Sequence, residues 1–224
     1  MSKRNRMNSL YGEDKVTSLK DKKVMIIGLG GVGSYASEAI ARSFVGHIII
    51  MDSDEYDITN MNRQLHCDDT TVGKSKAEVI GENIIKINSE VDLKILNQRL
   101  TKENIEKLVT DDIDFVIDAI DDMQVKLSLI KHCYDRNINI ITSCGTAKKV
   151  HPENLLIDDI YNTSVCPFAR KMRKELKKRG VKKLTVVYSK EDPLLNGNIL
   201  GSSAFVPGTA GLILASYVIN YFIE

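Results

Sequence analysis

The chain has 224 residues, of which 43% are hydrophobic and 27% charged, the proportions of a soluble globular protein with one large domain or two small ones. The net charge of +1 excludes any inference about partners from bulk charge, and the four cysteines, Cys67, Cys133, Cys144 and Cys166, form no CxxC pair. This spacing excludes a disulfide framework and argues against a structural zinc site, so we expect reduced thiols, no zinc and a cytoplasmic location.

The sequence predicts an alternation of strands and helices. Residues 1–22 are polar and predict a short helical lead-in around Tyr11 to Leu19, without the apolar stretch of a signal peptide. The predicted strands are Val24–Ile27, His47–Met51, Leu93–Leu96, Phe115–Asp118, Ile138–Thr142, Leu155–Ile160 and Leu184–Tyr188. The predicted helices are Val32–Phe44, Ser75–Ile87, Lys102–Val109, Met123–Arg136, Phe168–Arg179 and Thr209–Phe222. No linker divides this pattern, so we predict a single α/β domain over residues 1–224, with a Rossmann-like, doubly wound, mostly parallel sheet and helices on both faces.

A glycine-rich turn follows the first predicted strand. Gly28, Gly30 and Gly33 stand at the GxGxxG spacing, and a predicted helix comes directly after them. Glycines there let a phosphate approach bare backbone N–H groups at the positive end of the helix. The next strand ends in Asp52, 19 residues after Gly33, where an acid that holds a ribose hydroxyl is expected. The pattern predicts a nucleotide site, and an ordinary tight strand-to-helix turn is the alternative.

Polar segments follow the strands at the edge where such sheets bind ligands. These segments are Gly28–Gly33, Asp52–Gln64, Asp118–Asp122 and Ser143–Ala147, and we expect them to line one pocket.

A nucleoside triphosphate needs fixed cations and amides around its phosphates, whereas a hydride-transfer site does not. Arg63 suits bidentate phosphate contact, Lys76 suits a point charge, and Asp121 suits a magnesium ion that bridges phosphate oxygens. A solvated loop with N-cap aspartates and surface basic residues is the alternative.

Positive charge is concentrated in residues 169–183, within a crossover segment at about 160–192. This stretch holds nine Lys or Arg and one Glu, a local charge of +8. Met172 and Leu176 are spaced to pack inward, which leaves the charges on the outer face. A helix face that carries only positive charge predicts contact with the phosphate groups of a polyanion. A solvent-exposed face without a partner is the alternative.

The C-terminal residues 199–223 carry no charge, a length that would suit a membrane span. Glycines and a proline, among them Pro207, Gly208 and Gly211, interrupt the first half, and Asn220 interrupts the second. The uninterrupted part, Leu212 to Ile223, has the length of one buried helix. We therefore expect this segment to lie in the core or in a subunit interface, with no stable membrane span.

Five motifs between residues 6 and 147 resemble, in order and spacing, those of the ThiF/MoeB/HesA adenylyltransferase superfamily, relatives of ubiquitin-activating enzymes. They are Gly28-Leu-Gly-Gly-Val-Gly-Ser34, Asp52-Ser-Asp54, Asn60-Met-Asn-Arg-Gln64, Gly73-Lys-Ser-Lys76 and Asp118-Ala-Ile-Asp121. The resemblance implies ATP and Mg²⁺ as cofactors. It implies nucleotide contacts from Gly28, Gly30, Gly31, Gly33, Asp52, Asp54, Asn60, Arg63, Gln64, Lys76 and Asp121.

The same resemblance implies a role for several of these side chains. Asp52 would bind the ribose hydroxyls, Asn60 and Arg63 the triphosphate, and Asp121 the Mg²⁺, while Lys76 would support the transferring phosphate. Members of the superfamily make an acyl–adenylate, in which a carboxylate attacks the α-phosphate of ATP and pyrophosphate leaves. Catalysis then consists mostly of positioning and charge neutralisation.

Arg6 matches the family arginine that reaches into the neighbouring subunit's site, which implies a catalytic role for it in a homodimer. Sulfur-carrier adenylyltransferases of the superfamily usually hold zinc through two CxxC pairs, which this chain lacks. We also expect no catalytic-cysteine domain of the ubiquitin type in 224 residues. For Cys166, a thioester role and a small apolar packing role both stay open.

Four stretches of the chain resemble one branch of the superfamily, the tRNA threonylcarbamoyladenosine dehydratases. They are the basic segment at 169–183, Asp159-Ile-Tyr161, residues 184–193 and Tyr11-Gly12. In that branch the amino-acid carboxylate on a modified tRNA base is adenylated, and ring closure follows. The resemblance implies tRNA as partner, a sulfur-transfer protein as a further one, and tRNA contacts from Arg170, Lys171, Arg173, Lys174, Lys177, Lys178 and Arg179. Two departures are a shorter loop at 196–203 and an aspartate at Asp122, where a small polar residue is more usual and which could alter metal affinity.

Three other functions remain as alternatives. The first is an adenylyltransferase that activates the C-terminus of a ubiquitin-like sulfur-carrier protein, which the basic segment would also serve. The second is a nicotinamide-binding oxidoreductase with the same glycine turn, against which Arg63, Lys76 and Asp121 argue. The third is a non-catalytic nucleotide-gated module, which the complete motif set disfavours.

Overall fold

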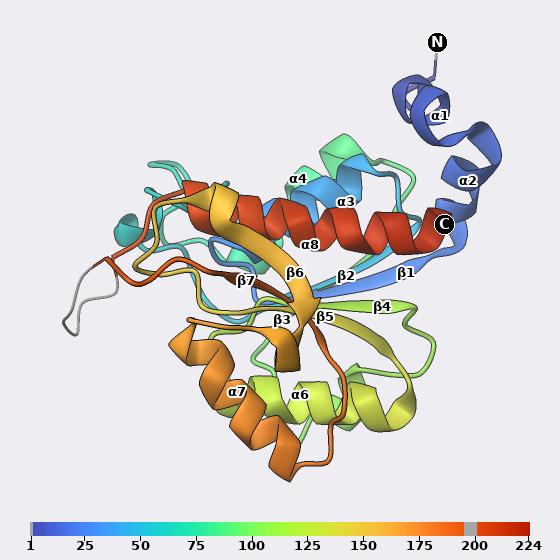
Figure 1. The fold of residues 1–224 in the computed structure, drawn as a ribbon. Coiled ribbons are helices and arrows are strands. Elements are labelled where there is room, and N and C mark those ends of the chain that lie inside the picture. The colour runs from blue at the N-terminus through green and yellow to red at the C-terminus, as the bar shows by residue number, and fades with distance from the viewer. Residues whose placement is uncertain (1, 195–200) are drawn as a thin grey trace.

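The computed structural model describes residues 2–194 and 201–224, and one seven-stranded sheet organises them (Figure 1). The strands are β1 (Lys23–Ile27), β2 (His47–Asp52), β3 (Asp92–Asn97), β4 (Phe115–Asp118), β5 (Asn139–Ser143), β6 (Leu155–Asp159) and β7 (Thr185–Ser189). Their order across the sheet is β3-β2-β1-β4-β5-β7-β6, and neighbours pair in parallel except β6 and β7. The predicted mostly parallel sheet is confirmed.

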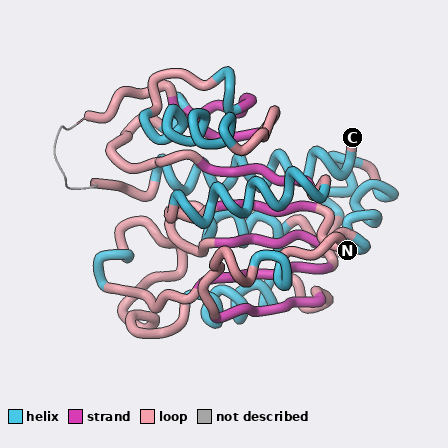
Figure 2. Tube along the Cα trace, turned by 90° about the horizontal axis from the view of Figure 1, so that it is seen from below, coloured by secondary structure: helices cyan, strands magenta, loops and turns pink. Residues whose placement is uncertain are grey.

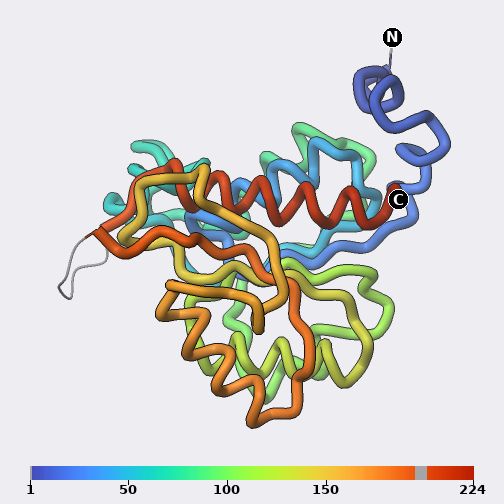
Figure 3. The backbone as a smooth tube through the Cα atoms, in the orientation of Figure 1, coloured from blue at the N-terminus to red at the C-terminus, as the bar shows by residue number. Residues whose placement is uncertain are grey.

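Helices cover both faces of the sheet, as predicted (Figure 1). The helices are α1 (Asn5–Tyr11), α2 (Glu13–Ser18), α3 (Gly33–Arg42), α4 (Lys76–Ile87), α5 (Ile105–Leu108), α6 (Met123–Arg136), α7 (Pro167–Lys178) and α8 (Phe205–Ile223). Helices α3, α4 and α8 pack on one face, and α5, α6 and α7 on the other. Both chain ends lie at the same end of the molecule, where α2 contacts α8 (Figure 3).

The interior strand β1 shows why these strands are continuous apolar runs. Val24 and Ile26 join the hydrophobic cluster under α3 and α8, whereas Met25 and Ile27 join the cluster under α6. A strand of a parallel sheet is covered on both faces, so both sets of alternating side chains must be apolar. In Figure 2 the strands lie side by side, and many loops gather at the end of the sheet opposite the two chain termini.

The turn between β1 and α3 requires glycine at two positions. Gly28 has a φ of +85°, and a Cβ added to it would lie 2.7 Å from the carbonyl oxygen of Ala119. A Cβ added to Gly33 would lie 1.7 Å from the carbonyl oxygen of Gly28, so α3 starts in direct contact with the strand end. At Gly30 the nearest atom to an added Cβ is the Gln64 amide nitrogen at 3.7 Å, an ordinary contact distance.

Two alanine substitutions should therefore separate folding from ligand binding. Gly33→Ala must displace backbone, so we expect it to lower the free energy of unfolding by about 2–3 kcal/mol. Gly30→Ala should keep the stability of the native protein but place a methyl group in the cavity and weaken ATP binding. Urea unfolding and calorimetric ATP titration measure the two effects. Equal stability of both variants would contradict this account of the turn.

Helix α8 is longer than predicted because it starts at Phe205 and not at Thr209. Pro207 lies in its first turn, where an N–H has no helical acceptor. A Cβ added to Gly211 would lie 2.2 Å from the carbonyl oxygen of Val32, so this glycine lets α3 approach closely. The interpretation of Pro207, Gly208 and Gly211 as interruptions was therefore wrong.

By length and composition α8 would suffice to cross a membrane, yet 56% of its apolar window is buried inside the molecule. That burial is what we expected of a core helix.

Two other predicted helices differ in extent. The lead-in forms two helices and not one, because Gly12 adopts a φ of +92° and its N–H bonds to Asn8, which ends α1. The predicted helix Lys102–Val109 contains only the single turn α5. Asn104 explains this, since its side chain accepts the Thr101 N–H at 2.8 Å and donates to the Arg99 carbonyl at 2.9 Å, which holds the preceding residues in a turn.

Candidate functional site

A cavity of about 1180 Å³ opens at the carboxyl ends of the parallel strands. All four segments that we expected to meet there line it: Gly28–Gly33, Asp52–Gln64, Asp118–Asp122 and Ser143–Ala147. Of the proposed nucleotide-binding residues, those lining the cavity are Gly28, Gly30, Gly31, Asp52, Asp54, Asn60, Arg63, Gln64, Lys76 and Asp121. Gly33 lies behind them at the first position of α3. The predicted convergence of these loops is confirmed.

The glycine turn presents a helix N-terminus to the cavity. No side chain caps α3, whose first turn follows Gly30, Gly31 and Val32 in the cavity wall. Asp52 stabilises the turn from β2, because its carboxylate accepts the Leu29 N–H at 2.6 Å and the Asp54 N–H at 2.8 Å. Uncapped N–H groups and the positive end of the helix dipole form a site for an anion such as phosphate.

Lys76 supplies a fixed positive charge at the same place. It is the first residue of α4, after the N-cap Ser75, and its backbone N–H bonds to the Asp54 carbonyl at 3.0 Å. Its ammonium pairs with the Asp54 carboxylate at 3.1 Å, and the Lys76 side chain is only 8% exposed. Asp54 and Lys76, which are 22 positions apart in the sequence, are thus adjacent in the cavity wall.

The loop after β2 folds through its own polar side chains. Asp57 and Asn60 form a capping box, with the Asp57 N–H bonding to the Asn60 side-chain oxygen at 3.2 Å. Hydrogen bonds from the Thr59 hydroxyl and amide hold the pKa of the exposed Asp57 carboxyl below its usual value. Arg63 donates to the Thr59 carbonyl at 2.7 Å, which sets the guanidinium in the cavity wall.

The next residue, Gln64, has a buried polar group without a hydrogen-bond partner among the described residues. It is 6% exposed, and the atom concerned is its side-chain oxygen. A buried polar atom without a partner is costly, so this amide is available to a bound ligand.

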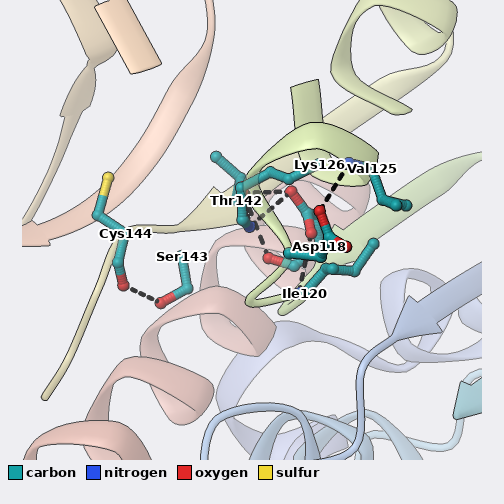
Figure 4. A network of polar contacts seen from close by, with 8 residues as sticks. Asp118, Ile120, Val125, Lys126, Thr142, Ser143 and Cys144 are labelled. Carbon is teal, nitrogen blue, oxygen red and sulfur yellow. Dashed lines mark hydrogen bonds and ion pairs between the residues drawn. The ribbon is translucent and has the colours of Figure 1, made fainter. Parts of the chain in front are cut away.

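A buried ion pair supports the loop that carries Asp121 (Figure 4). The Lys126 ammonium donates to the Asp118 carboxylate at 2.8 Å and to the Thr142 hydroxyl at 2.7 Å, and Asp118 and Lys126 are fully buried. Asp118 also accepts the Ile120 N–H at 3.0 Å. Lys126 was not among the site residues predicted from the sequence. The available signal was its position in the apolar stripe of α6, four and seven residues before Ile130 and Cys133.

The two aspartates after Ala119 and Ile120 differ in their surroundings. Asp121 is exposed in the cavity wall, where its role in holding Mg²⁺ stays a prediction. Asp122 is the N-cap of α6, since it accepts the N–H groups of Val125 and Gln124. These bonds, together with Arg99 at 3.2 Å, hold the pKa of Asp122 below its usual value. The unusual aspartate at this position therefore has a structural role.

The second half of the cavity is more apolar. Its wall includes Cys144, Gly145, Cys166 and Phe168, and a Cβ added to Gly145 would lie 3.5 Å from Phe168. Burial raises the pKa of the Cys144 thiol to about 12, so it is protonated at neutral pH. Cys166, for which a thioester role stayed open, is 2% exposed and belongs to a hydrophobic cluster.

Helix α7 begins in the cavity wall at Pro167 and carries the predicted basic face on its outer side. Arg170, Lys171, Lys174 and Lys177 are exposed. Three other residues predicted to contact tRNA are engaged within the chain or are less exposed. Arg173 donates to the Thr163 carbonyl at 2.7 Å, Lys178 pairs with Glu175 at 2.8 Å, and Arg179 is half-buried.

Arg6 does not reach this cavity. It is exposed on α1, near the chain termini at the other end of the sheet (Figure 1). Within residues 2–194 and 201–224, no three His, Cys, Asp or Glu side chains form a group that could hold a metal ion by themselves.

The profile of the ThiF family matches residues 2–223. The tRNA threonylcarbamoyladenosine dehydratase of Bacillus subtilis (strain 168) is 38% identical in an alignment that covers 93% of this chain and 89% of that protein. The crystal structure of the E. coli tRNA N6-threonylcarbamoyladenosine dehydratase TcdA in complex with ATP has a TM-score of 0.92 at 31% identity, and covers 97% of this chain and 92% of that one. The molybdopterin-synthase adenylyltransferase of Escherichia coli (strain K12) is 31% identical over 132 residues, 59% of this chain and 53% of that protein.

These similarities agree with the geometry of the site. The family match spans both the glycine turn and the loops that line the cavity. The dehydratase relative covers nearly the whole chain, whereas the molybdopterin-synthase relative covers little more than half of it. This chain belongs to the ThiF family.

Proposed function

We propose that this protein is an ATP-dependent enzyme that adenylates the carboxylate of threonylcarbamoyladenosine in tRNA and promotes its cyclising dehydration. The observation that carries the proposal is a single cavity in which an uncapped helix N-terminus, Arg63, Lys76 and Asp121 converge. The dehydratase relatives and the ATP complex of TcdA support it. A cavity of about 1180 Å³ has space for a nucleotide and for part of a second substrate.

The side chains present suit phosphoryl chemistry by positioning and charge neutralisation. The turn at Gly30 to Val32 and the N-terminus of α3 face the phosphates, and Arg63 and Lys76 stabilise the charge that develops on the leaving pyrophosphate. The substrate carboxylate forms a bond to the α-phosphorus as the bond to pyrophosphate breaks. Ring closure at the activated carbonyl then expels AMP, which carries away the carboxylate oxygen lost in the dehydration.

Mg²⁺ fits the donor set that the cavity offers. This ion is bound in proteins through one or two carboxylates together with substrate phosphates, and Asp121 is exposed where it would hold such an ion. When bound, Mg²⁺ would polarise the phosphoryl oxygens as a Lewis acid. We propose no zinc, because the four cysteines form no CxxC pair in the sequence.

We further propose a cytoplasmic homodimer. Arg6 lies outside the cavity of its own chain, so the family role of this arginine requires a second copy. Leu10, on the same helix, is 71% exposed and would be available for contact with that second copy. A sulfur-transfer protein is a further proposed partner.

Mass spectrometry of tRNA nucleosides tests the proposed function directly. Incubation of the protein with ATP, Mg²⁺ and tRNA that carries threonylcarbamoyladenosine should convert that nucleoside to a product lighter by one water. AMP should appear in equal amount. The same tRNA without the modification is the control and should yield neither product. AMP release with the unmodified tRNA, or none with the modified one, would contradict the proposal.

The exposed lysines of α7 should contribute to tRNA affinity. Lys174→Glu with Lys177→Glu should weaken tRNA binding and reduce the slope of log K against log salt by about 2, because each lost phosphate contact releases one counterion fewer. Filter binding from 50 to 200 mM salt measures the slope. Lys86→Glu with Lys94→Glu makes the same charge change on α4 and β3, at the opposite edge of the sheet, and is the matched control. An equal loss in both pairs would show that only net charge matters.

A ubiquitin-like sulfur-carrier protein is the second candidate substrate, and the similarity to the molybdopterin-synthase adenylyltransferase favours it. Such a protein would present a flexible C-terminal carboxylate to the same cavity. The two candidates differ in what triggers pyrophosphate exchange, which would be a purified carrier protein in one case and modified tRNA in the other. AMP release with tRNA alone favours the dehydratase.

A further inference from the structure

Three lysines in the described part of the chain are more than nine-tenths buried, and two of them have an obvious counter-charge. Lys76 pairs with Asp54 at 3.1 Å, and Lys126 pairs with Asp118 at 2.8 Å. The third, Lys149, is 4% exposed and forms no ion pair among the described residues. A buried charge is normally paired, so Lys149 calls for an explanation.

The Lys149 ammonium is held by backbone carbonyl groups. It donates to the Glu191 carbonyl at 2.9 Å and to the Ser189 carbonyl at 3.4 Å, just beyond the end of β7. The Glu191 carboxylate accepts the N–H groups of Val150 and His151 at 3.0 Å and lies close enough to interact electrostatically with Lys149, without forming an ion pair with it. An ammonium has three donors. The two carbonyls engage two of them, so one donor and a positive charge without a direct ion pair remain for a ligand.

Lys149 lies in the wall of the same cavity as the nucleotide-binding residues, but in its other half. Hydrogen bonds connect its segment to the wall that contains Arg63. The Lys148 N–H bonds to the Gly201 carbonyl at 2.8 Å, and the Asn62 side chain bonds to the Ser202 carbonyl at 2.8 Å. Lys149 therefore belongs to a wall that is tied to the phosphate-binding loop.

The position of this charge favours a carboxylate over a phosphate as its ligand. The phosphate-binding half already contains Arg63, Lys76 and the N-terminus of α3. The half around Lys149 is lined by Cys144, Gly145 and Phe168, which offer apolar surface for an organic group. A single ammonium beside such an apolar surface suits a singly charged anion with a carbon framework.

We propose that the Lys149 ammonium binds the threonyl carboxylate of the substrate and positions it for attack on the α-phosphate. This assignment rests on the proposed function. A hydrogen bond to one carboxylate oxygen leaves the other oxygen free as the nucleophile. Holding the two reacting groups in one cavity converts their encounter into an effectively unimolecular step.

The test compares two tRNA ligands that differ only in this charge. One carries threonylcarbamoyladenosine, and the other carries the same nucleoside with its carboxylate capped as the methylamide. Affinities are measured with a non-hydrolysable ATP analogue present. A hydrogen bond to a charged group predicts that the native protein prefers the acid by about 10- to 100-fold. Lys149→Gln should lower this preference to nearly 1, whereas Lys149→Arg should retain it.

Two measurements guard against a general loss of structure. Lys149→Gln leaves an amide that can still donate to the carbonyls, and its melting temperature is recorded beside that of the native protein. The preference is a ratio within one variant, so a lower fraction of folded protein does not change it. Lys190→Gln removes the same charge from an exposed residue next to the site and should keep the native preference.

Each outcome decides the assignment. Loss of the acid preference in Lys149→Gln alone supports it. A preference that survives in Lys149→Gln overturns it, and a fall in ATP affinity with an unchanged preference would assign the charge to a phosphate. If the native protein releases no AMP with the modified tRNA, the proposed function itself fails, and the assignment of Lys149 with it.

Discussion

Arg63→Ala is expected to lower kcat for AMP formation by about 10²- to 10³-fold, the typical effect of removing one preorganised group that stabilises transition-state charge. The guanidinium lies in the cavity wall, where the Thr59 carbonyl holds it at 2.7 Å. Because charge grows on the leaving pyrophosphate, its contribution should appear in kcat more than in the KM for ATP. Steady-state AMP release with modified tRNA measures both constants.

The controls for Arg63→Ala address charge and stability separately. Arg63→Lys keeps the charge but loses the bidentate geometry, so we expect it to recover only part of the rate. Arg136→Ala removes an exposed arginine that pairs with Asp111 outside the cavity, and its rate should stay within about twofold of the native one. An Arg63→Ala protein that turns over at the native rate would remove the phosphoryl-transfer mechanism.

Lys126→Ala is expected to lower the free energy of unfolding by about 3–5 kcal/mol, since it leaves the buried Asp118 carboxylate without its partner. Both side chains are 0% exposed, and the pair also holds Thr142 on the neighbouring strand. The strand end that this pair supports leads directly into the loop of Asp121. Urea denaturation monitored by circular dichroism measures the change, and the same preparation should show weaker ATP binding.

A double variant shows whether the cost comes from the unpaired charge. Asp118→Asn with Lys126→Met removes both charges together and should cost clearly less than Lys126→Ala alone. Lys131→Ala breaks an exposed pair with Asp135 on the same helix, and should cost no more than about 1 kcal/mol. A single variant as stable as the double one would mean that Asp118 is neutral or finds water after the substitution.

The positions of the main strands and helices could be predicted from short-range patterns. The bounds of β4 and α6 agree with the prediction, because an apolar run and a helical stripe next to capping residues are local features of the chain. The predictions failed where a distant segment altered a local rule. Gly208 looked like a helix breaker and lies outside the predicted helix Thr209–Phe222, yet it is part of α8, where an added Cβ would lie 3.1 Å from the Tyr35 ring of α3.

The candidate site was predictable for those residues that come directly after the carboxyl ends of parallel strands. Parallel strands bring their carboxyl ends to one edge, so the loops with Asp52, Arg63 and Asp121 had to meet once the sheet order allowed it. The structure adds the supporting groups that spacing does not reveal. Lys126 sits on the apolar stripe of a helix, and Lys149 lies in a loop where no periodicity applies.

The amino-acid sequence by itself determined the glycine turn, the strand-and-helix alternation and the polar loops at one edge, because each of these depends on residues close together in the chain. Only the tertiary structure decided that β7 inserts between β5 and β6, that α7 starts in the cavity wall, and that Lys149 is buried. Burial of a charge is a property of the segments that surround it. Here those segments are about 40 residues away in the chain, at Ser189 and Glu191, beyond the reach of any local pattern.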